Sequence, residues 1–280
     1  MCTVDARRMT VTGTGSESTG TPVSDKIFWH RYLPFYELYF ERLADAAWVM
    51  EYGVDRGASI AYLSRRFEHA QVVGCDIIEP RPEWPRSPRI SYATVDQGSR
   101  SSLAGLLAGF PGPYDLVIED GSHRPEHQAN CLVATLCHVR GGGLYILEDL
   151  HTSHPEYRPR ERSTRDRVNC YHLLLAFEHL RARRVELTDD VAQSLSRKSL
   201  FTETEVRDLY ARIASVALYR RAALPLRCFR CGSDEFAYAT LRCRCGTWLM
   251  RGVDSLAAVL TIREGGRPAR SLLLSDVRRL

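Results

Sequence analysis

Short apolar runs alternate with amphipathic stretches along most of the chain. The apolar runs predict strands at 47–52, 71–77, 89–97, 114–123 and 142–150, and the segments between and after them have helical periodicity at 59–67, 99–110, 127–139 and 170–183. Strands that alternate with helices predict a parallel sheet with crossover helices. The pattern therefore predicts an α/β fold, Rossmann-like and doubly wound, with a mostly parallel sheet.

Three other segments depart from this alternation. Residues 25–44 are aromatic and amphipathic, which predicts one helix near a site, whereas 151–169 is rich in Arg and Pro and predicts a loop. Residues 1–24 are rich in Ser, Thr and Gly and lack the apolar core of a secretory signal. We expect 1–24 to be disordered and 25–224 to form the main domain.

The cysteines predict a second, smaller unit at 225–280. Cys228 and Cys231 are separated by two residues, Cys243 and Cys245 by one, and a glycine follows each pair. Two such pairs are typical of a structural Zn²⁺ site with four thiolate ligands, although reduced free thiols are the alternative. We expect a zinc-ribbon-like subdomain whose closed metal site folds a segment too small to bury its own core.

Composition and charge exclude only a few classes of function. The chain has 280 residues and a formal net charge of +4, and all but Lys26 and Lys198 of its 38 basic residues are arginines. This bias gives little support to nucleic-acid binding. No apolar run reaches the length of a membrane span. We expect a cytoplasmic protein that is not bound to a membrane.

Acidic residues gather where two predicted strands end. YDLVIEDGSH at 114–123 ends in Glu119, Asp120 and His123, and GGGLYILEDLHTS at 141–153 repeats the arrangement with Glu148 and Asp149. The carboxyl ends of parallel strands lie at one rim, where such sheets bind ligands. Asp120, Glu148 and Asp149 would give a hard oxygen set suited to Mg²⁺, and Glu119 should point away because strand side chains alternate.

The stretch EYGVDRGASI at 51–60 predicts a cofactor-binding turn. Glu51 ends a strand, Gly53 and Gly57 allow close backbone approach, and Ser59 begins a helix with free N–H groups. The stretch matches neither a GxGxxG fingerprint nor a P-loop, so an adenosyl ligand is favoured over a dinucleotide or a nucleoside triphosphate.

Three further residues at strand ends complete the predicted cofactor site. Asp76 follows the turn by about 20 residues and suits ribose hydroxyls. Asp96 and Gln97 end the third strand, where an adenine could be bound. Each acid taken alone is equally compatible with a solvated cap.

In these motifs the sequence resembles class I S-adenosylmethionine-dependent methyltransferases, and among them the metal-dependent sugar O-methyltransferases of glycosylated natural products such as antibiotics. The resemblance covers about residues 24–155 and includes SDK…HRYLPFYE, EYGVDRGAS, VDQ, IEDGSH and LEDLHTS. It implies that Asp120, Glu148 and Asp149 bind magnesium and that His123 is the general base. His30 and Tyr32 match the opening motif and would cover the cofactor, although aromatic packing explains them nearly as well.

The resemblance implies a chemistry that the residues can perform. A sugar hydroxyl is a poor nucleophile until a divalent cation lowers its pKa, and a histidine near neutrality can accept its proton. We expect methyl transfer from S-adenosylmethionine to a glycosylated small molecule or a nucleotide sugar. His151 and His154 would line the substrate side, unless they lie on a solvated loop. The resemblance also implies a homo-oligomer.

Two other functions remain open from the sequence. An RNA methyltransferase would use the Arg-rich loop and the zinc ribbon to hold phosphates, although the carboxylates argue against it. A non-catalytic partner-binding module with the same fold is the second, and the acids together with His123 count against it.

Overall fold

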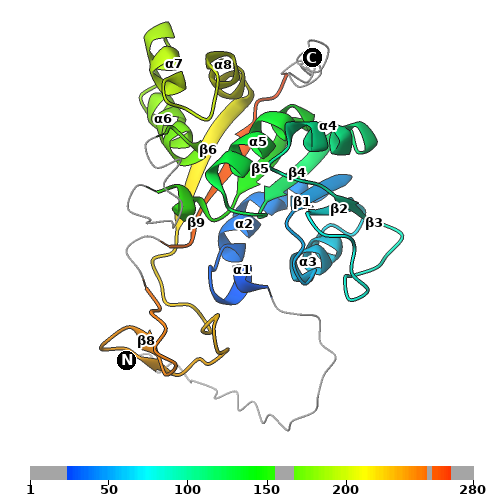
Figure 1. The fold of residues 1–280 in the computed structure, drawn as a ribbon, viewed down its shortest axis with the longest axis vertical. Coiled ribbons are helices and arrows are strands. Elements are labelled where there is room, and N and C mark those ends of the chain that lie inside the picture. Colours follow the sequence, from blue (N-terminus) through cyan, green and yellow to red (C-terminus); the bar gives the residue numbers. More distant parts are fainter. Residues whose placement is uncertain (1–23, 155–166, 251–253, 266–280) are drawn as a thin grey trace, which may run out of the picture.

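Seven strands form one sheet through the centre of the molecule (Figure 1). The computed structural model describes residues 24–154, 167–250 and 254–265. The strand order is β3-β2-β1-β4-β5-β9-β6. The strands are β1 (Trp48–Tyr52), β2 (Gln71–Asp76), β3 (Ile90–Thr94), β4 (Tyr114–Glu119), β5 (Val139–Leu147), β6 (Ile213–Arg220) and β9 (Leu256–Ile262).

The sheet is parallel from β3 to β5, as the alternating pattern predicts. Strand β9 is antiparallel to both β5 and β6. The first two strands of the chain, β1 and β2, lie beside each other, and β4 lies on the other side of β1. This reversal of strand order next to β1 opens a crevice at the carboxyl ends of the strands, where a ligand can bind.

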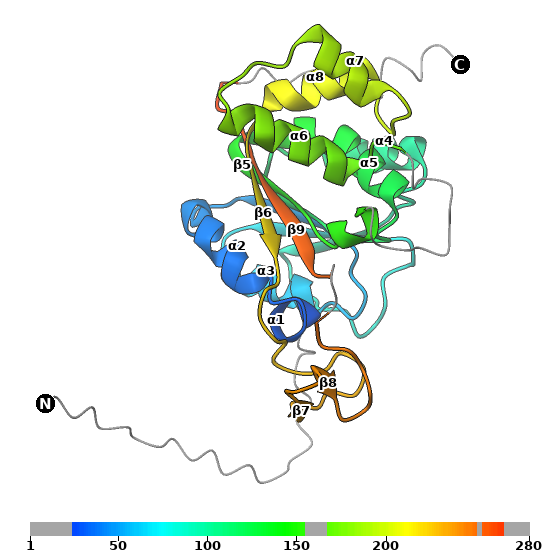
Figure 2. The ribbon, with the colours of Figure 1, turned by 90° about the vertical axis from the view of Figure 1, so that its left-hand side faces the viewer.

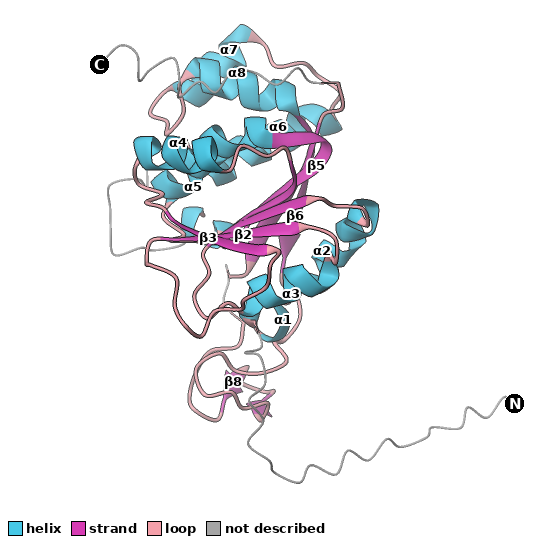
Figure 3. Cartoon of the chain, turned by 90° about the vertical axis from the view of Figure 1, so that its right-hand side faces the viewer, coloured by secondary structure: helices cyan, strands magenta, loops and turns pink. Residues whose placement is uncertain are grey.

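Helices cover both faces of the sheet (Figures 2 and 3). The first face carries α1 (Asp25–Phe28), α2 (Leu33–Phe40) and α3 (Ala58–Arg66), and the second carries α4 (Arg100–Gly109), α5 (Pro125–Thr135), α6 (Cys170–Ala182), α7 (Asp189–Ser196) and α8 (Glu203–Arg212). Successive strand side chains point to opposite faces, so Val49 packs with the first layer and Met50 with the second. The doubly wound fold is confirmed.

The segment 25–44 differs from the single helix that its pattern predicts. Helix α1 ends at Phe28, α2 begins at Leu33, and a 3-10 turn (Glu41–Leu43) follows α2. Pro34 lies in the first turn of α2, where its missing N–H costs no hydrogen bond, and Arg31 has a positive φ of 56°. The break between the helices frees His30 and Tyr32 to turn toward the strand ends.

The extent expected for the small unit at 225–280 also differs from the structure, because β9 within it belongs to the main sheet. Strand β9 lies inside the main sheet between β5 and β6, so the cysteine segment is an insertion between two neighbouring strands. Short strands β7 (Phe236–Ala237) and β8 (Arg242–Cys243) pair within it. Figure 2 shows this insertion beside α1, on the side of the sheet away from α6 to α8. The sequence pattern did not reveal this return of the chain, because pairing of β9 with β5 and β6 joins residues far apart in the sequence.

Two sequence expectations fall outside the described residues. The disorder expected for 1–24 concerns residues that the structure does not describe, except Ser24, whose hydroxyl caps α1 by accepting from the Lys26 amide at 3.3 Å. Most of the expected loop at 151–169 lies outside them too, while Leu150–Ser153 form a 3-10 turn. Within the described ranges, every helix is too short or too polar to cross a bilayer.

Candidate active site

A cavity of about 610 Å³ opens at the carboxyl ends of the parallel strands. It runs from the turn after β1, past the ends of β2 and β3, to the acids at the ends of β4 and β5. Helix α1 forms the wall beside those acids. Of the residues predicted from sequence, its lining includes Gly53, Ser59, Asp76, Asp96, Gln97, Asp120, His123, Glu148 and Asp149, whereas Glu51 and Gly57 lie outside it.

A buried lysine on α1 lies among three of the acids. Lys26 is 6% exposed, and its Nζ contacts an Asp120 carboxylate oxygen, lies 2.8 Å from Glu148 Oε1 and lies 3.4 Å from Glu51 Oε1. Burial disfavours the ammonium, but these carboxylates outweigh it and raise the pKa of Lys26. Burial raises the pKa of Glu51 to about 7, although Lys26 opposes the shift. The lysine therefore supplies the positive charge that this cluster needs.

Asp149 differs from Glu51, because its neighbours lower its pKa and keep its carboxylate ionised. Tyr32 Oη donates to Asp149 Oδ1 at 2.7 Å, and the Nδ1 atoms of His30 and His151 each lie 3.7 Å from the same oxygen. Burial would raise the pKa of Asp149, yet His30, His123 and His151 lower it to about 2. Tyr32 and His30 thus reach a predicted metal ligand, and His151 lies beside it.

His123 lies between the two acidic strand ends. Its Nε2 is 3.6 Å from Asp149 Oδ2 and its Nδ1 is 3.9 Å from Asp120 Oδ1. Burial lowers the pKa of His123, but the neighbouring carboxylates of Asp149, Asp120 and Glu119 raise it above the ordinary value overall. The side chain remains 34% exposed, so it can accept a proton from a ligand in the cavity.

The backbone is strained at these strand ends. His123 has φ 56° and Asp149 has φ 52°, in the left-handed region that residues other than glycine seldom adopt. Such strain persists where the surrounding structure fixes it, and it concentrates at functional sites. The side chains of these two residues approach each other to 3.6 Å where they line the cavity, which supports a functional role for the pair.

Gly53 is needed for a reason that the sequence did not reveal. Its φ is +90°, and a Cβ added there would lie 1.9 Å from the Asp120 carbonyl oxygen. The turn therefore passes against the end of β4, as well as bordering the cavity. Asp76 accepts from the Val54 amide at 2.8 Å, so part of its carboxylate holds the turn in place.

Two predicted site residues form a supporting layer. Ser59 donates to Glu51 Oε2 at 2.6 Å beneath the turn. Gln97 Nε2 donates to Glu119 Oε1 at 2.7 Å, and Gln97 Oε1 accepts from the Ser122 amide at 3.0 Å. Glu119 is fully buried, and burial raises its pKa to about 7, which fits a side chain that points away from the cavity. Gln97 thus braces the DGSH turn.

Some of the predicted acidic ligands are placed where they could bind one divalent cation. One ligand atom each from Asp120, His123 and Asp149 lie within 4.8 Å of one another, a spacing at which a single ion could contact all three. The carboxylate oxygens are ligands that Mg²⁺ prefers. Glu148 is not in this group, and Lys26 contacts both Glu148 and Asp120, so an ion here would compete with the lysine for both acids. The structure thus groups two of the three predicted ligands.

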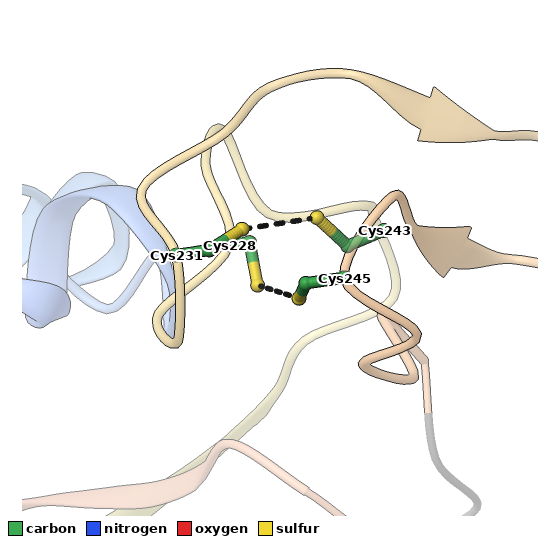
Figure 4. Close-up of side chains that lie close together, drawn as sticks. All are labelled: Cys228, Cys231, Cys243 and Cys245. Carbon is green, nitrogen blue, oxygen red and sulfur yellow. Dashed lines mark hydrogen bonds between the residues drawn. The ribbon is translucent and has the colours of Figure 1, made fainter.

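The four clustered cysteines come together in the insertion. Cys228 Sγ lies 3.7 Å from Cys245 Sγ, and Cys231 Sγ lies 3.4 Å from Cys243 Sγ (Figure 4). All four sulfurs lie within 4.8 Å of one another, and none forms a disulfide. This arrangement is compatible with one tetrahedral metal ion held by two knuckles.

Lys26 is a site residue that sequence reasoning missed. The available signal was its rarity, since it is one of two lysines in an arginine-rich chain and lies in the SDK motif at the start of an amphipathic helix. Its partners follow it by 25 or more positions in the sequence, so only folding brings them together.

Comparison with known proteins supports the resemblance. The chain is 36% identical over 139 residues to an 8-demethyl-8-alpha-L-rhamnosyl tetracenomycin-C 2'-O-methyltransferase of Streptomyces olivaceus, covering 47% of this chain and 36% of that protein. It is 33% identical over 133 residues to demethylmacrocin O-methyltransferase of Streptomyces fradiae, covering 45% and 33%. The matched region spans about a third of these relatives' length. No protein-family model matches the chain.

A solved structure confirms the architecture. The chain aligns with the MycE methyltransferase from the mycinamycin biosynthetic pathway, in complex with Mg and SAH, at a TM-score of 0.53 and 20% identity, covering 85% of this chain and 52% of that one. This likeness establishes the fold. The chain therefore has the class I S-adenosylmethionine-dependent methyltransferase fold, and its sequence is similar to natural-product sugar O-methyltransferases.

Proposed function

We propose that this protein transfers a methyl group from S-adenosylmethionine to a sugar hydroxyl of a glycosylated natural product or a nucleotide sugar, in a magnesium-dependent reaction. The observation that carries the proposal is the meeting of Asp120, His123 and Asp149 in a cavity that continues to the glycine turn after β1. The Streptomyces olivaceus relative is named as a 2'-O-methyltransferase of a rhamnosyl tetracenomycin, which supports the acceptor class.

Asp120 and Asp149 would hold the magnesium ion, with Glu148 as a third ligand once it leaves Lys26. When bound, the ion would supply positive charge that lowers the pKa of an acceptor hydroxyl. Lys26 would then neutralise Glu51, which stays buried beneath the turn. Tyr32 would keep Asp149 oriented through its hydrogen bond.

His123 would act as the general base. Its imidazole faces the cavity between the two carboxylates and could take the proton of the hydroxyl as the oxygen attacks the sulfonium methyl carbon. The new oxygen–carbon bond forms as the sulfur–carbon bond breaks, which leaves S-adenosylhomocysteine. Holding both reactants in this geometry accounts for much of the rate in such transfers.

The cofactor would lie along the turn after β1. Gly53 and Ser59 border the cavity there, and Asp76 could accept from a ribose hydroxyl with its remaining oxygen lone pairs. Asp96 is exposed at the end of β3 and could reach the adenine. Glu51, Gly57 and Gln97 would support this cofactor site from beneath or beside it.

The cysteine insertion would hold a structural zinc ion through Cys228, Cys231, Cys243 and Cys245. Thr247 hydrogen-bonds to the Cys245 sulfur at 3.1 Å and lowers the pKa of that thiol to about 6, which favours the thiolate that metals bind. Elemental analysis of protein purified without chelator should find about one zinc per chain. A zinc content near zero would leave four free thiols and end this part of the proposal.

The RNA methyltransferase alternative is not favoured. A carboxylate-lined cavity is a poor site for the many phosphates of an RNA backbone, and the Streptomyces olivaceus relative is named for a rhamnosyl tetracenomycin. The partner-binding module would have no use for a strained acid–histidine pair. Homo-oligomer formation stays a prediction.

The deciding test is calorimetric titration with S-adenosylhomocysteine, with and without Mg²⁺, followed by turnover with labelled methyl donor and glycosylated acceptors. We expect one-to-one binding and magnesium-dependent transfer to a sugar oxygen. Absence of binding in both conditions would exclude the methyltransferase function. Binding without transfer, whatever the acceptor, would favour the partner-binding module.

A further inference from the structure

The cysteine insertion contributes an aromatic side chain to the catalytic cavity. Phe229 lies between Cys228 and Cys231, the cysteine pair that forms the first knuckle of the insertion. The fold of this knuckle therefore sets the position of Phe229. Phe229 lines the same cavity as Asp120 and His123, and 58% of its surface is exposed. Phe229 therefore places an exposed aromatic ring at the edge of the cavity, where it can contact a ligand.

Direct contacts join this knuckle to the wall beside the acids. The Phe229 ring packs edge-on against Trp29 at 4.6 Å, and the Leu226 amide donates to the Phe28 carbonyl at 2.7 Å. Trp29 directly follows α1, the helix that carries Lys26. Buried Cys228 packs in the same small apolar cluster as Trp29. The position of Phe229 is therefore coupled both to the cysteines and to α1.

The placement of Phe229 indicates the acceptor side. Phe28 and His30 line the same wall, and His30 lies 3.7 Å from the Asp149 carboxylate. Phe28 and Phe229 thus add apolar surface next to the acids. A sugar hydroxyl bound at the acids would leave the rest of the acceptor near this wall.

We propose that the cysteine insertion forms the acceptor-side wall of the cavity and that Phe229 contacts the apolar group to which the methylated sugar is attached. Filling the cysteine site with zinc fixes the knuckle and therefore strengthens acceptor binding without taking part in chemistry. This inference rests on the proposed function, because it needs a glycosylated acceptor at Asp120 and Asp149.

The test uses Phe229→Ala in the full chain, loaded with S-adenosylhomocysteine and Mg²⁺. The probes are p-nitrophenyl α-L-rhamnoside, which has an apolar aryl group, and methyl α-L-rhamnoside, which lacks one. We expect the dissociation constant of the aryl glycoside to rise about tenfold, equivalent to about 1.4 kcal/mol of aromatic contact. The affinities for methyl rhamnoside and S-adenosylhomocysteine should change less than about twofold.

Two further variants distinguish an effect of the first knuckle from a general loss of folding. Cys231→Ser should lose zinc and weaken aryl glycoside binding about as much as Phe229→Ala does. Tyr238→Ala removes another exposed aromatic residue of the same insertion, one that does not line the cavity, and should bind both glycosides like the wild type. Equal melting temperatures of Phe229→Ala and wild type would show that the fold is intact.

Each of the remaining outcomes would contradict one specific claim. Unchanged aryl glycoside affinity in Phe229→Ala would remove the wall assignment and leave the proposed function standing. Weaker S-adenosylhomocysteine binding with unchanged glycoside binding would assign Phe229 to the cofactor instead. If the wild type bound S-adenosylhomocysteine but neither glycoside, the proposed acceptor class would fail and this inference with it.

Discussion

At the scale of single residues, Lys26 places a buried positive charge among three acids. It is the only basic side chain in the molecule's described part that lies within 3.5 Å of Glu51, Asp120 and Glu148 together. Removing one partner from a buried ionic cluster leaves uncompensated charge, which is more costly than losing an exposed pair. The same cluster would attract a divalent cation.

Lys26→Met should lower the free energy of unfolding by about 3 kcal/mol or more in the absence of divalent cations. Millimolar Mg²⁺ should restore part of that loss, because an ion bound only to the folded state stabilises it. Urea unfolding with and without Mg²⁺ measures both effects. The control is Lys198→Met, which changes the other, exposed lysine and should have little effect. A variant that Mg²⁺ does not stabilise would argue against a cation site at these acids.

His123→Gln should reduce methyl transfer by about 100- to 10,000-fold, because a general base contributes about that much. Its affinity for S-adenosylhomocysteine should stay near the wild-type value, since the imidazole lies toward the acids. His138→Gln is the matched control, because His138 hydrogen-bonds to the Pro111 carbonyl outside the cavity. Near-normal turnover of His123→Gln in a labelled-methyl assay would exclude the base assignment.

At the scale of elements, the turn from β1 to α3 is fixed by its contact with β4. Gly53 has room for no side chain because the Asp120 carbonyl occupies the space. Gly105 on α4 is the opposite case, since an added Cβ would meet nothing within 4 Å. The same substitution should therefore have opposite effects at the two positions.

Gly53→Ala should destabilise the protein by at least about 2 kcal/mol, through the clash and the positive φ together. Gly105→Ala should stabilise it by about 0.5–1 kcal/mol, because alanine restricts the unfolded chain and favours helix. Thermal and urea unfolding of both variants would check the pair. A Gly53→Ala variant as stable as the wild type would mean that the turn can move away from β4.

At the scale of the whole molecule, Arg221 joins the sheet, α1 and the cysteine insertion. It follows β6 directly and is fully buried at its guanidinium, which donates to the Trp29 carbonyl at 3.0 Å and the Leu249 carbonyl at 2.7 Å. It also pairs with Asp254 at 3.1 Å, just before β9. Both ends of the insertion and the end of α1 thus meet at one side chain.

Arg221→Met should lower the free energy of unfolding by about 3–5 kcal/mol, because it leaves Asp254 and two carbonyls without this donor. It should also weaken acceptor binding, since Trp29 supports Phe229. Arg220→Met, at the exposed neighbouring position, is the control. Chemical denaturation measures the stability, and loss of less than about 1 kcal/mol would show that the insertion is held by other contacts.

Much of the fold and part of the candidate site could be predicted from the sequence. The period of apolar residues determined β1 to β5 and the helices between them, because each buried strand needs a run of apolar side chains. The acids and His123 could be located at strand ends for the same reason. Cysteine spacing likewise identified the four residues that meet in the insertion.

Only the tertiary structure decided which of these residues meet. It placed Glu148 beside Lys26, inserted β9 between β5 and β6, and brought Phe229 to the cavity at the strand ends. These contacts join residues far apart in the chain, and local periodicity carries no information about such pairs. Burial and charge pairing in the folded state selected them, so they become visible only when the sheet and its layers are assembled.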